Sequence, residues 1–341
     1  MNRTMKRWTL NETGRQNLKL TEAEIPQPGP HEVLVRVNAV ALNYRDKVII
    51  DGGMGNGMPM PFTPGSDMAG VVEAVGQGVT RFRPGDRVIS SFNADWIEGK
   101  LENNAANPHY NTLGYAIQGV LAEYVVMSEA WLVAAPRTLN DAQASTLVCA
   151  GLTAWFALVE RGHLRAGESV LVQGTGGVAL FVLQIAKAMG AEVFITSSSD
   201  DKLAAAAALG ADHGINRNKE DWVEAVYRLT HQRGIDHVVD TVGGRHFADS
   251  VRAVASHGRI SLIGMMDTHD TSASGGLLLL KSPTIQGIGV GHRRALEDLV
   301  RAVDTIALKP VIDKSFRFDE LPEALAYLDK GAFGKIVIEI G

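Results

Sequence analysis

Cysteine is almost absent from this sequence of 341 residues, since Cys149 is the only one. A single cysteine excludes a disulfide within the chain and any metal site built from four cysteines. Aromatic residues make up only 6% of the chain, and the 33 Lys and Arg residues are outnumbered by 38 Asp and Glu and are not clustered. This charge balance argues against a nucleic-acid partner.

Long apolar runs are also missing, since none approaches the roughly 20 residues that a membrane-spanning helix needs. Arg3, Lys6 and Arg7 are not followed by the apolar core of a secretory signal. We therefore expect no membrane partner and, with only one cysteine, a cytoplasmic protein. The length is sufficient for two domains.

The most informative stretch that is present begins with the apolar run Ser169–Gln173, which predicts a short buried parallel strand. A glycine loop follows at once, formed by Gly174, Thr175, Gly176 and Gly177. Apolar residues then recur at helical spacing, and these are Val178, Phe181, Val182, Ile185 and Met189. A second strand is expected over Val193–Thr196. This order of elements is the dinucleotide-binding fingerprint in its proper context.

The glycines of this loop have separate physical roles. Gly174 permits the tight turn out of the strand, and Gly176 lets the backbone come close to a pyrophosphate. The N-terminus of the following helix offers free N–H groups and partial positive charge to the phosphates. An ordinary glycine turn in an α/β domain is the alternative interpretation.

The end of the second strand carries hydroxyl groups instead of an acid. A cofactor without a 2′-phosphate is usually held there by Asp or Glu, whereas this chain has Ser197 and Ser198. Lys202, and Arg217 after the third strand, could supply positive charge to a phosphate. The acidic pair at residues 200–201 opposes this unless it faces solvent or caps the next helix. We expect NADPH rather than NADH, and a polar loop indifferent to the phosphate is the alternative.

Residues 1 to about 135 are expected to be rich in β-structure. Val33, Val35 and Val37 alternate along one predicted strand, and glycine and proline turns separate it from others. The stretch Asn93–Gly119 has little pattern and is either a solvated surface loop or a lid.

From about Ser145 the pattern changes to helices alternating with strands, which predicts a parallel sheet with right-handed crossovers. We expect a helix over Ser145–Glu160 and a sixth strand over Ile285–Val290. In the tail, a helix capped by Asp319 precedes the strand Lys335–Ile340. The predicted domains are residues 1–140 with 291–341, and residues 141–290.

Several short motifs are distributed over nearly the whole chain: Asn43–Asp46, Pro64–Val72, Pro84–Val88, Cys149–Trp155, the glycine loop and Gly334–Val337. Together they resemble the medium-chain dehydrogenase/reductase superfamily. The resemblance implies an α/β protein, with a GroES-like β-rich catalytic domain interrupted by a Rossmann domain. That second domain is a doubly wound, six-stranded parallel sheet.

The departures from the family pattern concern zinc. Zinc alcohol dehydrogenases of this family have cysteine where this chain has Asn43 and histidine where it has Ser66, and only Cys149 keeps its type. A catalytic zinc needs three firm protein ligands, and an amide and a hydroxyl are poor ones. The chain therefore resembles the zinc-lacking branch, similar to quinone oxidoreductases and enoyl reductases, and we expect no metal.

The resemblance also implies roles for individual residues. Asn43 or Tyr44 would hold the substrate oxygen, and Tyr44 or water would supply a proton. Asp46 completes the catalytic group, more as a structural hydrogen-bonding residue than as a base. Further pocket residues are Arg45, Ser66 and Cys149. Further cofactor contacts are Thr153, Val178, Gly264, Met265, Val290 and Lys335.

The expected function is transfer of a hydride from NADPH to a conjugated carbonyl compound, a quinone or an enone, without zinc. An alcohol dehydrogenase or ketone reductase of the same fold is one alternative, and a non-catalytic NADPH-binding sensor or structural protein is another. The apolar stretch 277–290 ends the predicted parallel sheet. An exposed edge is unfavourable, and the resemblance implies that two such edges pair in a homodimer.

Overall fold

The computed structural model describes residues 3–55, 57–101, 103–106, 108, 111–266 and 270–341. The chain forms two compact units, Met1–Leu152 with Val290–Gly341, and Thr153–Gly289. Residues 141–152 belong with the first unit because α2 (Asp141–Ser145) packs on two of its strands, β3 (Glu32–Leu42) and β4 (Asp67–Val75). Among these residues, no helix combines the length and apolarity that crossing a membrane requires.

The first unit is rich in β-structure, as expected. Within the described residues its main sheet has the order β14-β15-β3-β4-β5-β7, and β6 also pairs with β3. The remaining strands of this sheet are β5 (Arg87–Ser90), β6 (Tyr124–Ser128), β7 (Leu132–Ala134), β14 (Ile312–Arg317) and β15 (Lys335–Glu339). A separate hairpin consists of β1 (Thr4–Thr9) and β2 (Lys19–Glu24). The unit's main helices are α1 (Tyr44–Ile50), α2, α9 (Arg293–Ile306) and α10 (Leu321–Asp329).

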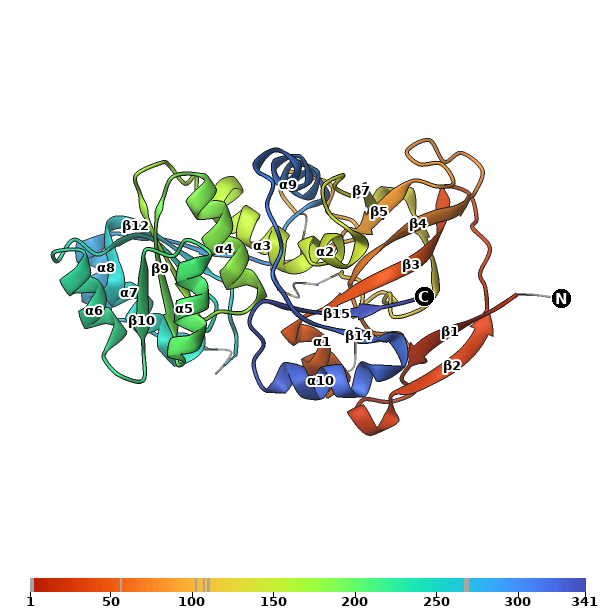
Figure 1. Ribbon diagram of the computed structural model, residues 1–341, viewed down its shortest axis with the longest axis horizontal. Helices are drawn as coiled ribbons and strands as arrows, with labels where there is room; N and C mark the ends of the chain where they lie inside the picture. Colours follow the sequence, from red (N-terminus) through yellow and green to blue (C-terminus); the bar gives the residue numbers. More distant parts are fainter. Residues whose placement is uncertain (1–2, 56, 102, 107, 109–110, 267–269) are drawn as a thin grey trace. The chain divides into compact units, whose positions relative to one another are not determined.

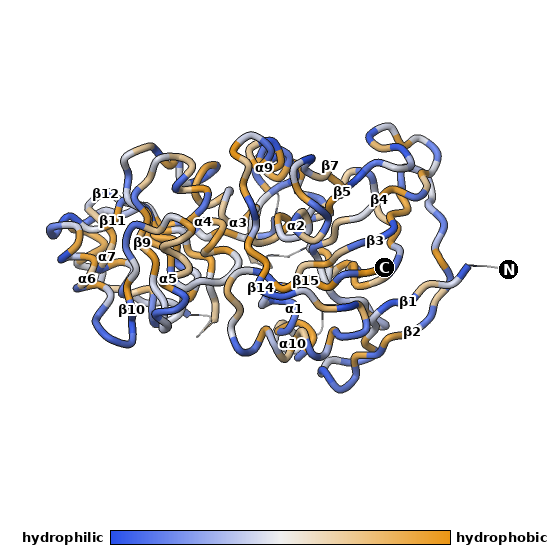
Figure 2. Tube along the Cα trace, in the orientation of Figure 1, coloured by the Kyte–Doolittle hydropathy of each residue, from blue (hydrophilic) through white to orange (hydrophobic). Residues whose placement is uncertain are grey.

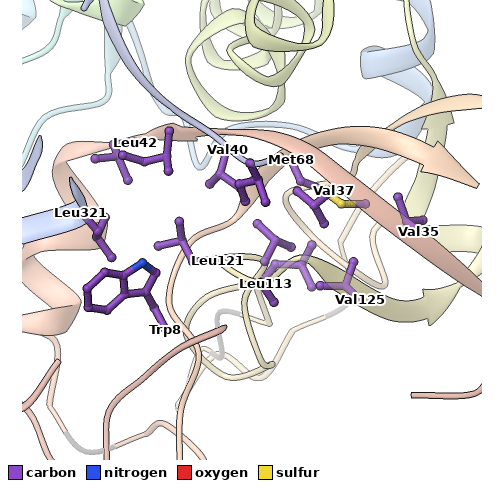
Figure 3. Packing of buried hydrophobic residues seen from close by; sticks show 14 of the residues in the cluster. Trp8, Val35, Val37, Val40, Leu42, Met68, Leu113, Leu121, Val125 and Leu321 are labelled. Carbon is purple, nitrogen blue, oxygen red and sulfur yellow. The ribbon is translucent and has the colours of Figure 1, made fainter. Parts of the chain in front are cut away.

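Strand β3 is the centre of this unit because it pairs with β4, β6 and β15. Its register against β4 slips between Val37 and Ala39, so the side-chain alternation changes phase there. The core side chains from β3 are Val33, Val35 and Val37 before the slip and Val40 and Leu42 after it. Figure 3 shows four of them beside Met68 and Leu121. Because of this slip, side chains from both halves of the strand point into the same core.

The second unit has the expected doubly wound sheet (Figure 1). In the described residues its six parallel strands have the order β10-β9-β8-β11-β12-β13. These are β8 (Ser169–Gln173), β9 (Glu192–Ser197), β10 (His213–Asn216), β11 (Ile235–Asp240), β12 (Val254–Leu262) and β13 (Thr284–Gly287). The order reverses between β8 and β11, and ligands of such sheets bind at this switch point.

Helices cover both faces of this parallel sheet. Helices α4 (Gly177–Ala188) and α5 (Asp200–Ala208) pack on β8, β9 and β10. On the other face lie α6 (Trp222–Leu229), α7 (Phe247–Ala253) and α8 (Gly275–Lys281), and α7 contacts β11 and β12 (Figure 1). The central strands are mostly apolar and buried, as Figure 2 shows along their traces. This is the pattern expected for strands that are covered on both sides.

Three local expectations were wrong. The helix expected over Ser145–Glu160 is broken into α2, α3 (Leu152–Trp155) and two π-type segments, because bonds such as Gly151 N–H to Thr146 O span five residues. The sixth strand ends at Gly287, and Val290 beyond it has a φ of 67°. Asp319 lies in a 3₁₀ turn, and α10 is capped by Glu320 without a side-chain hydrogen bond.

The stretch 93–119 is attached to the first unit at several points, although residues 102, 107 and 109–110 lie outside the described part. Asn93 forms a β-bridge with Thr112. At the start of α9, the backbone N–H of Arg293 donates to Trp96 O at 3.0 Å, and that of Arg294 donates to Ile97 O at 2.9 Å. These bonds fix residues 93–97 to the first turn of α9.

Candidate active site

The candidate site of the first unit begins where β3 ends and α1 starts. Asn43 is the N-cap of α1, and its backbone N–H donates to Asp46 Oδ2 at 2.8 Å. This bond satisfies a donor that the strand no longer pairs, and it places a carboxylate near the positive end of the helix. Asn43 is 9% exposed and Asp46 is 1% exposed. The two side chains are therefore held in a buried turn.

Lys335, the first residue of β15, lies beside this turn. Its strand pairs antiparallel with β3, and Ile336 stands opposite Leu42. The Lys335 side chain is 4% exposed, and its ammonium donates to Leu42 O at 2.7 Å and to Asn43 Oδ1 at 2.6 Å. The same ammonium lies 3.9 Å from Asp67 Oδ2. A lysine is therefore buried at a position that sequence reasoning assigned to the cofactor site.

Asp67 contacts both Lys335 and the other two positions of the family's zinc pattern, Ser66 and Cys149. Asp67 Oδ1 accepts a hydrogen bond from Ser66 Oγ at 2.6 Å, and Oδ2 accepts the Cys149 backbone N–H at 3.0 Å. Ser66 and Asp67 are fully buried. The structure thus brings Asn43, Ser66 and Cys149 into one buried cluster around the Lys335 ammonium and the Asp67 carboxyl group.

Burial controls the protonation of this cluster. It raises the pKa of Asp67, and the Lys335 charge and the Ser66 hydrogen bond act in the opposite direction. Burial, together with the Asp67 charge, raises the pKa of the Cys149 thiol to about 12. Cys149 is therefore a neutral thiol near pH 7, and neutral thiols are poor nucleophiles.

The Asn43 amide has one nitrogen that is not used. Its oxygen accepts from Lys335, whereas its Nδ2 has no hydrogen-bond partner among the described residues. The amide lies close enough to Asp67 to help lower the pKa of that carboxyl group, but it forms no bond of normal geometry with it. A buried donor without a partner is rare in folded proteins. Asn43 Nδ2 is therefore a buried donor whose hydrogen-bonding capacity is not used by the described residues.

Tyr44 lies outside the buried cluster, whereas Arg45 adjoins it, with Nη1 3.7 Å from Asp46 Oδ1. Tyr44 is 43% exposed, with Lys47 Nζ 5.0 Å from the centre of its ring. Arg45 donates to Thr112 Oγ1 at 2.8 Å and to Leu113 O at 3.1 Å. Its guanidinium carbon also lies 4.7 Å from the centre of the Phe92 ring. These contacts hold the loop at residues 112–113 against α1.

In the second unit, the glycine loop lies at the carboxyl end of β8. Gly174 has a φ of 79°, and its N–H donates to Thr196 Oγ1 at 3.2 Å. A Cβ placed on Gly174 or Gly176 would have no described atom within 4 Å, so the space before the loop is open. Gly176 is the N-cap of α4, and no side chain caps the free N–H groups of Gly177 and Val178. These features fit the phosphates of a dinucleotide.

The end of β9 shows how the neighbouring charges are arranged. Ser197 is buried, and its Oγ accepts the Ser199 N–H at 3.2 Å, whereas Ser198 is exposed. Asp200 accepts from Asn216 Nδ2 at 2.6 Å and from Lys219 Nζ at 2.5 Å. These contacts lower the pKa of Asp200 and offset its charge. Asp200 therefore repels a nearby phosphate less strongly than its position in the sequence suggests.

Arg217 is an exposed cation just after β10, beside this strand end. Its backbone N–H donates to Ser197 O at 3.0 Å, which places it directly beside the serine loop. Lys202 lies in the first turn of α5, and its N–H donates to the N-cap Ser199. The structure therefore groups Ser198, Lys202 and Arg217 around the end of β9.

Other predicted cofactor residues lie at the neighbouring strand ends. The Asp240 carboxylate accepts the Val242 and Gly243 N–H groups at 3.0 and 2.8 Å, which orders the turn after β11. Gly264 follows β12, and a Cβ there would lie 2.2 Å from the carbonyl of Thr241, so only glycine fits. The remaining predicted residues differ in exposure: Thr175 and Thr153 are buried, Met265 is 64% exposed, and Val290, which belongs to the first unit, is 6% exposed.

Sequence reasoning missed Asp67 and the contact between Lys335 and Asn43. Asp67 is followed by the apolar residues 68–72 of β4, and an acid at the start of such a run is a signal of a buried polar contact. The partner of that acid is not visible in the sequence, because Lys335 lies at the other end of the chain.

The chain is similar in sequence to known dehydrogenases and reductases. The chain matches the model of an alcohol dehydrogenase GroES-like domain over residues 29–137 and that of a zinc-binding dehydrogenase over residues 177–305. It is 37% identical to a zinc-type alcohol dehydrogenase-like protein of Schizosaccharomyces pombe, with 96% of each chain covered. It is 31% identical to an acryloyl-coenzyme A reductase of Metallosphaera sedula (95% and 97% covered). It is 27% identical to a quinone oxidoreductase of Homo sapiens (95% and 94% covered).

Solved structures show the same likeness. A crystal structure from Sinorhizobium meliloti, provisionally named an alcohol dehydrogenase, has a TM-score of 0.97 at 60% identity, with 99% of both chains covered. Another, named an NAD-dependent alcohol dehydrogenase, has a TM-score of 0.90 at 35% identity, covering 99% of this chain and 100% of the other. The fold and the glycine loop define a dinucleotide-dependent dehydrogenase. The chain belongs to the medium-chain dehydrogenase/reductase family and is an NAD(P)-dependent oxidoreductase of the alcohol dehydrogenase and quinone oxidoreductase type.

The buried cluster does not fit the zinc that the family model's description implies. Of the three ligand positions, the Asn43 oxygen accepts from an ammonium and the Ser66 hydroxyl donates to Asp67, so Cys149 is the one thiol where a catalytic zinc needs three firm ligands. A divalent cation would also stand close to the Lys335 charge. Among the described residues, no group of three His, Cys, Asp or Glu side chains could hold a metal ion.

Asp46 gives a test of the buried turn. Burial raises its pKa from 3.8 to about 6, so the folded state binds this proton more tightly than the unfolded state. The stability that Asp46 contributes is therefore full at low pH and is lost as pH rises through about 6. We predict that the unfolding free energy of the wild type, relative to Asp46→Asn, falls by about 2 kcal/mol between about pH 4.5 and about pH 7.5. Urea unfolding at both pH values measures this difference, and a constant difference would contradict the prediction.

Proposed function

We propose that this protein is an NADPH-dependent reductase of conjugated carbonyl compounds, quinones or enones, that works without catalytic zinc. The observation that carries this proposal is the free Nδ2 of Asn43, a buried hydrogen-bond donor beside an ammonium instead of a metal ion. Relatives named quinone oxidoreductase and acryloyl-coenzyme A reductase support it, since both act on conjugated acceptors.

The choice of a conjugated substrate follows from the strength of the available donor. A zinc ion stabilises a developing alkoxide by several kcal/mol, and a single amide N–H supplies less. In an enone or a quinone, the negative charge spreads over the conjugated system, so the oxygen needs less stabilisation. A nicotinamide nucleotide supplies the hydride when it is bound.

The residues of the first unit bind the substrate oxygen, hold the turn in place and supply the proton. Asn43 Nδ2 donates to the substrate oxygen and holds it in a fixed position. Asp46 holds the Asn43 backbone, which keeps the turn in place. Tyr44 is exposed next to Asn43, and its hydroxyl, or water, delivers the proton that completes the reduction. Cys149 stays neutral and lines the cluster.

In the second unit, the glycine loop from Gly174 to Val178 would hold the pyrophosphate. NADPH is preferred over NADH because the end of β9 presents Ser198 and the Arg217 cation, while Asp200 is offset by Lys219.

A second candidate is an alcohol dehydrogenase or ketone reductase of the same fold. The names of the Schizosaccharomyces pombe relative and of the Sinorhizobium meliloti structure favour it. It requires a stronger electrophile at the carbonyl oxygen than the buried cluster offers.

We also propose that the protein acts as a homodimer in the cytoplasm. Strand β13 pairs only with β12 among the described strands, and it forms the end of the parallel sheet. Leu279 and Leu280 of α8 and Ile285 of β13 are 79%, 78% and 40% exposed. A second copy paired at this edge would cover them.

The function is tested by combining each nicotinamide cofactor with quinones, cyclic enones, plain ketones and alcohols, with the metal content measured on the same sample. We expect NADPH oxidation with quinones or enones at a zinc content far below one per chain. Activity confined to plain ketones or alcohols would favour the dehydrogenase, and activity that tracks bound zinc would overturn the metal-free proposal.

Asn43→Asp tests the proposed donor directly. Aspartate keeps the size of the side chain and an oxygen facing Lys335, but it replaces the free N–H group with an acceptor. We expect kcat with an enone to fall by about 10²- to 10³-fold while NADPH still binds, as for the loss of an oxyanion donor. Asn17→Asp is the control, because Asn17 Nδ2 donates to Thr13 O and the charge change is the same. A kcat close to that of the control would exclude Asn43 as the donor.

Arg217→Ala tests the preference for the phosphate. Loss of this exposed cation should raise the KM for NADPH by roughly fivefold to tenfold and leave that for NADH unchanged, because only NADPH carries the 2′-phosphate. Arg228→Ala is the control, since Arg228 is an exposed cation on α6 that pairs with Glu220. Equal effects on both cofactors would show that Arg217 does not recognise the phosphate.

A further inference from the structure

The Lys335 ammonium is buried among three acceptors. Two of them, Leu42 O and Asn43 Oδ1, lie at 2.7 and 2.6 Å, and the third, Asp67 Oδ2, lies at 3.9 Å. An ammonium has three N–H groups and no lone pair, so every group that faces it must be an acceptor. Removing such a charge from water is costly unless all of its donors are directed in this way. The surroundings of Lys335 are therefore determined by its charge.

This requirement fixes the orientation of the Asn43 amide. The oxygen and the nitrogen of an asparagine amide have nearly the same shape, and only the hydrogen bonds distinguish them. If the amide were reversed, its NH₂ group would face the ammonium, so two donors would face each other and the ammonium would lose an acceptor. Lys335 therefore keeps the Asn43 oxygen toward itself and directs Nδ2 away.

The nitrogen that is directed away is the donor without a partner. Asn43 is nine-tenths buried, and the N–H groups of Nδ2 bind nothing in the described part of the chain. The nearest competitor is Asp67, whose carboxyl group the amide influences without a bond of normal geometry. Lys335 weakens this competition because its charge is also attracted to Asp67.

We propose that Lys335 is a positioning residue for carbonyl reduction, and that its buried ammonium, in the cluster where relatives of this fold hold a metal ion, orients Asn43 so that Nδ2 is free for the substrate oxygen. This inference rests on the proposed function for its role in turnover. The contact of Lys335 with Asn43 stands independently of it. The substrate oxygen thus meets an amide that a fixed cation holds in place, and no metal is required there.

Two other roles for Lys335 predict different experimental results. A contact with the cofactor, as expected from the sequence, would change NADPH binding and leave Asn43 unaffected. A purely structural role, joining β15 to β3 through Leu42 O, would lower stability and leave the kinetic constants of the folded enzyme unchanged. Only the positioning role links Lys335 to the Asn43 side chain.

The first experiment needs no substrate. The Asn43 side-chain NH₂ signals are identified in a ¹⁵N-labelled sample as the pair that disappears in Asn43→Ala. In Lys335→Met we expect this pair to shift and to exchange with solvent at least tenfold faster, because the amide is no longer held. An unchanged pair would show that Lys335 does not orient Asn43, whatever the activity of the enzyme.

The second experiment is a double-mutant cycle on kcat with an enone. Lys335→Met should lower kcat at least tenfold in the wild type while the KM for NADPH changes less than twofold. In the Asn43→Ala background the same change should lower kcat less than twofold, because its effect passes through Asn43. Equal losses in both backgrounds, or a raised KM for NADPH, would overturn the proposal. If the wild type reduces no conjugated carbonyl at all, the proposed function fails, and the NMR result still decides the contact.

Two further variants keep the result interpretable. Lys281→Met is the matched control, because the Lys281 ammonium donates to Val251 O, Arg252 O and Val254 O in the second unit. It should lower stability without changing kcat. Lys335→Gln keeps an N–H group that can reach the Asn43 oxygen, so it should restore part of kcat if Lys335→Met folds poorly. No recovery in a folded Lys335→Gln protein, with Asn43 still oriented, would contradict the positioning role.

Discussion

The contact between the Lys335 ammonium and the turn at residues 42–43 is the constraint on which the candidate site depends. A buried cation is tolerated only when acceptors surround it, and here they come from the end of β3, the start of β4 and an amide side chain. Because β15 pairs with β3 in a fixed register, Lys335 is placed beside Leu42 by the sheet itself. The polar cluster is therefore a consequence of strand pairing in the core.

The same cation is connected to the other two positions of the family's zinc pattern through Asp67. Asp67 accepts the Ser66 hydroxyl and the Cys149 backbone N–H. Asp67 in turn lies close to Lys335. The cluster contains a positive charge that belongs to the chain. In the proposed reaction, this ammonium would polarise a substrate only through Asn43, which would make it a weaker electrophile than a metal ion and would suit it to acceptors that already delocalise charge.

The sequence predicted those parts of the structure that depend on local patterns. The glycine loop, the strand before it and the helix after it are encoded within about 30 residues, and the six-stranded sheet follows from their repetition. The Lys335 contact was not predictable, because it joins side chains 292 residues apart in the sequence. The phase change in β3 was missed for a related reason, since it depends on its pairing with β4. The π-type segments after α2 likewise interrupt an apparently regular helical pattern.

In both units a lysine lies close to an acid and offsets its charge. In the first unit this pair is Lys335 and Asp67, and in the second it is Lys219 and Asp200. The second pair reduces the repulsion between Asp200 and a phosphate at the end of β9. The two cases differ in burial, since Lys335 is enclosed and Lys219 is exposed. Salt screens exposed charges over about 8 Å at physiological ionic strength but reaches buried pairs much less. The orientation of Asn43 should therefore be insensitive to salt, whereas recognition of a phosphate by Arg217 and its exposed neighbours should weaken as salt is added.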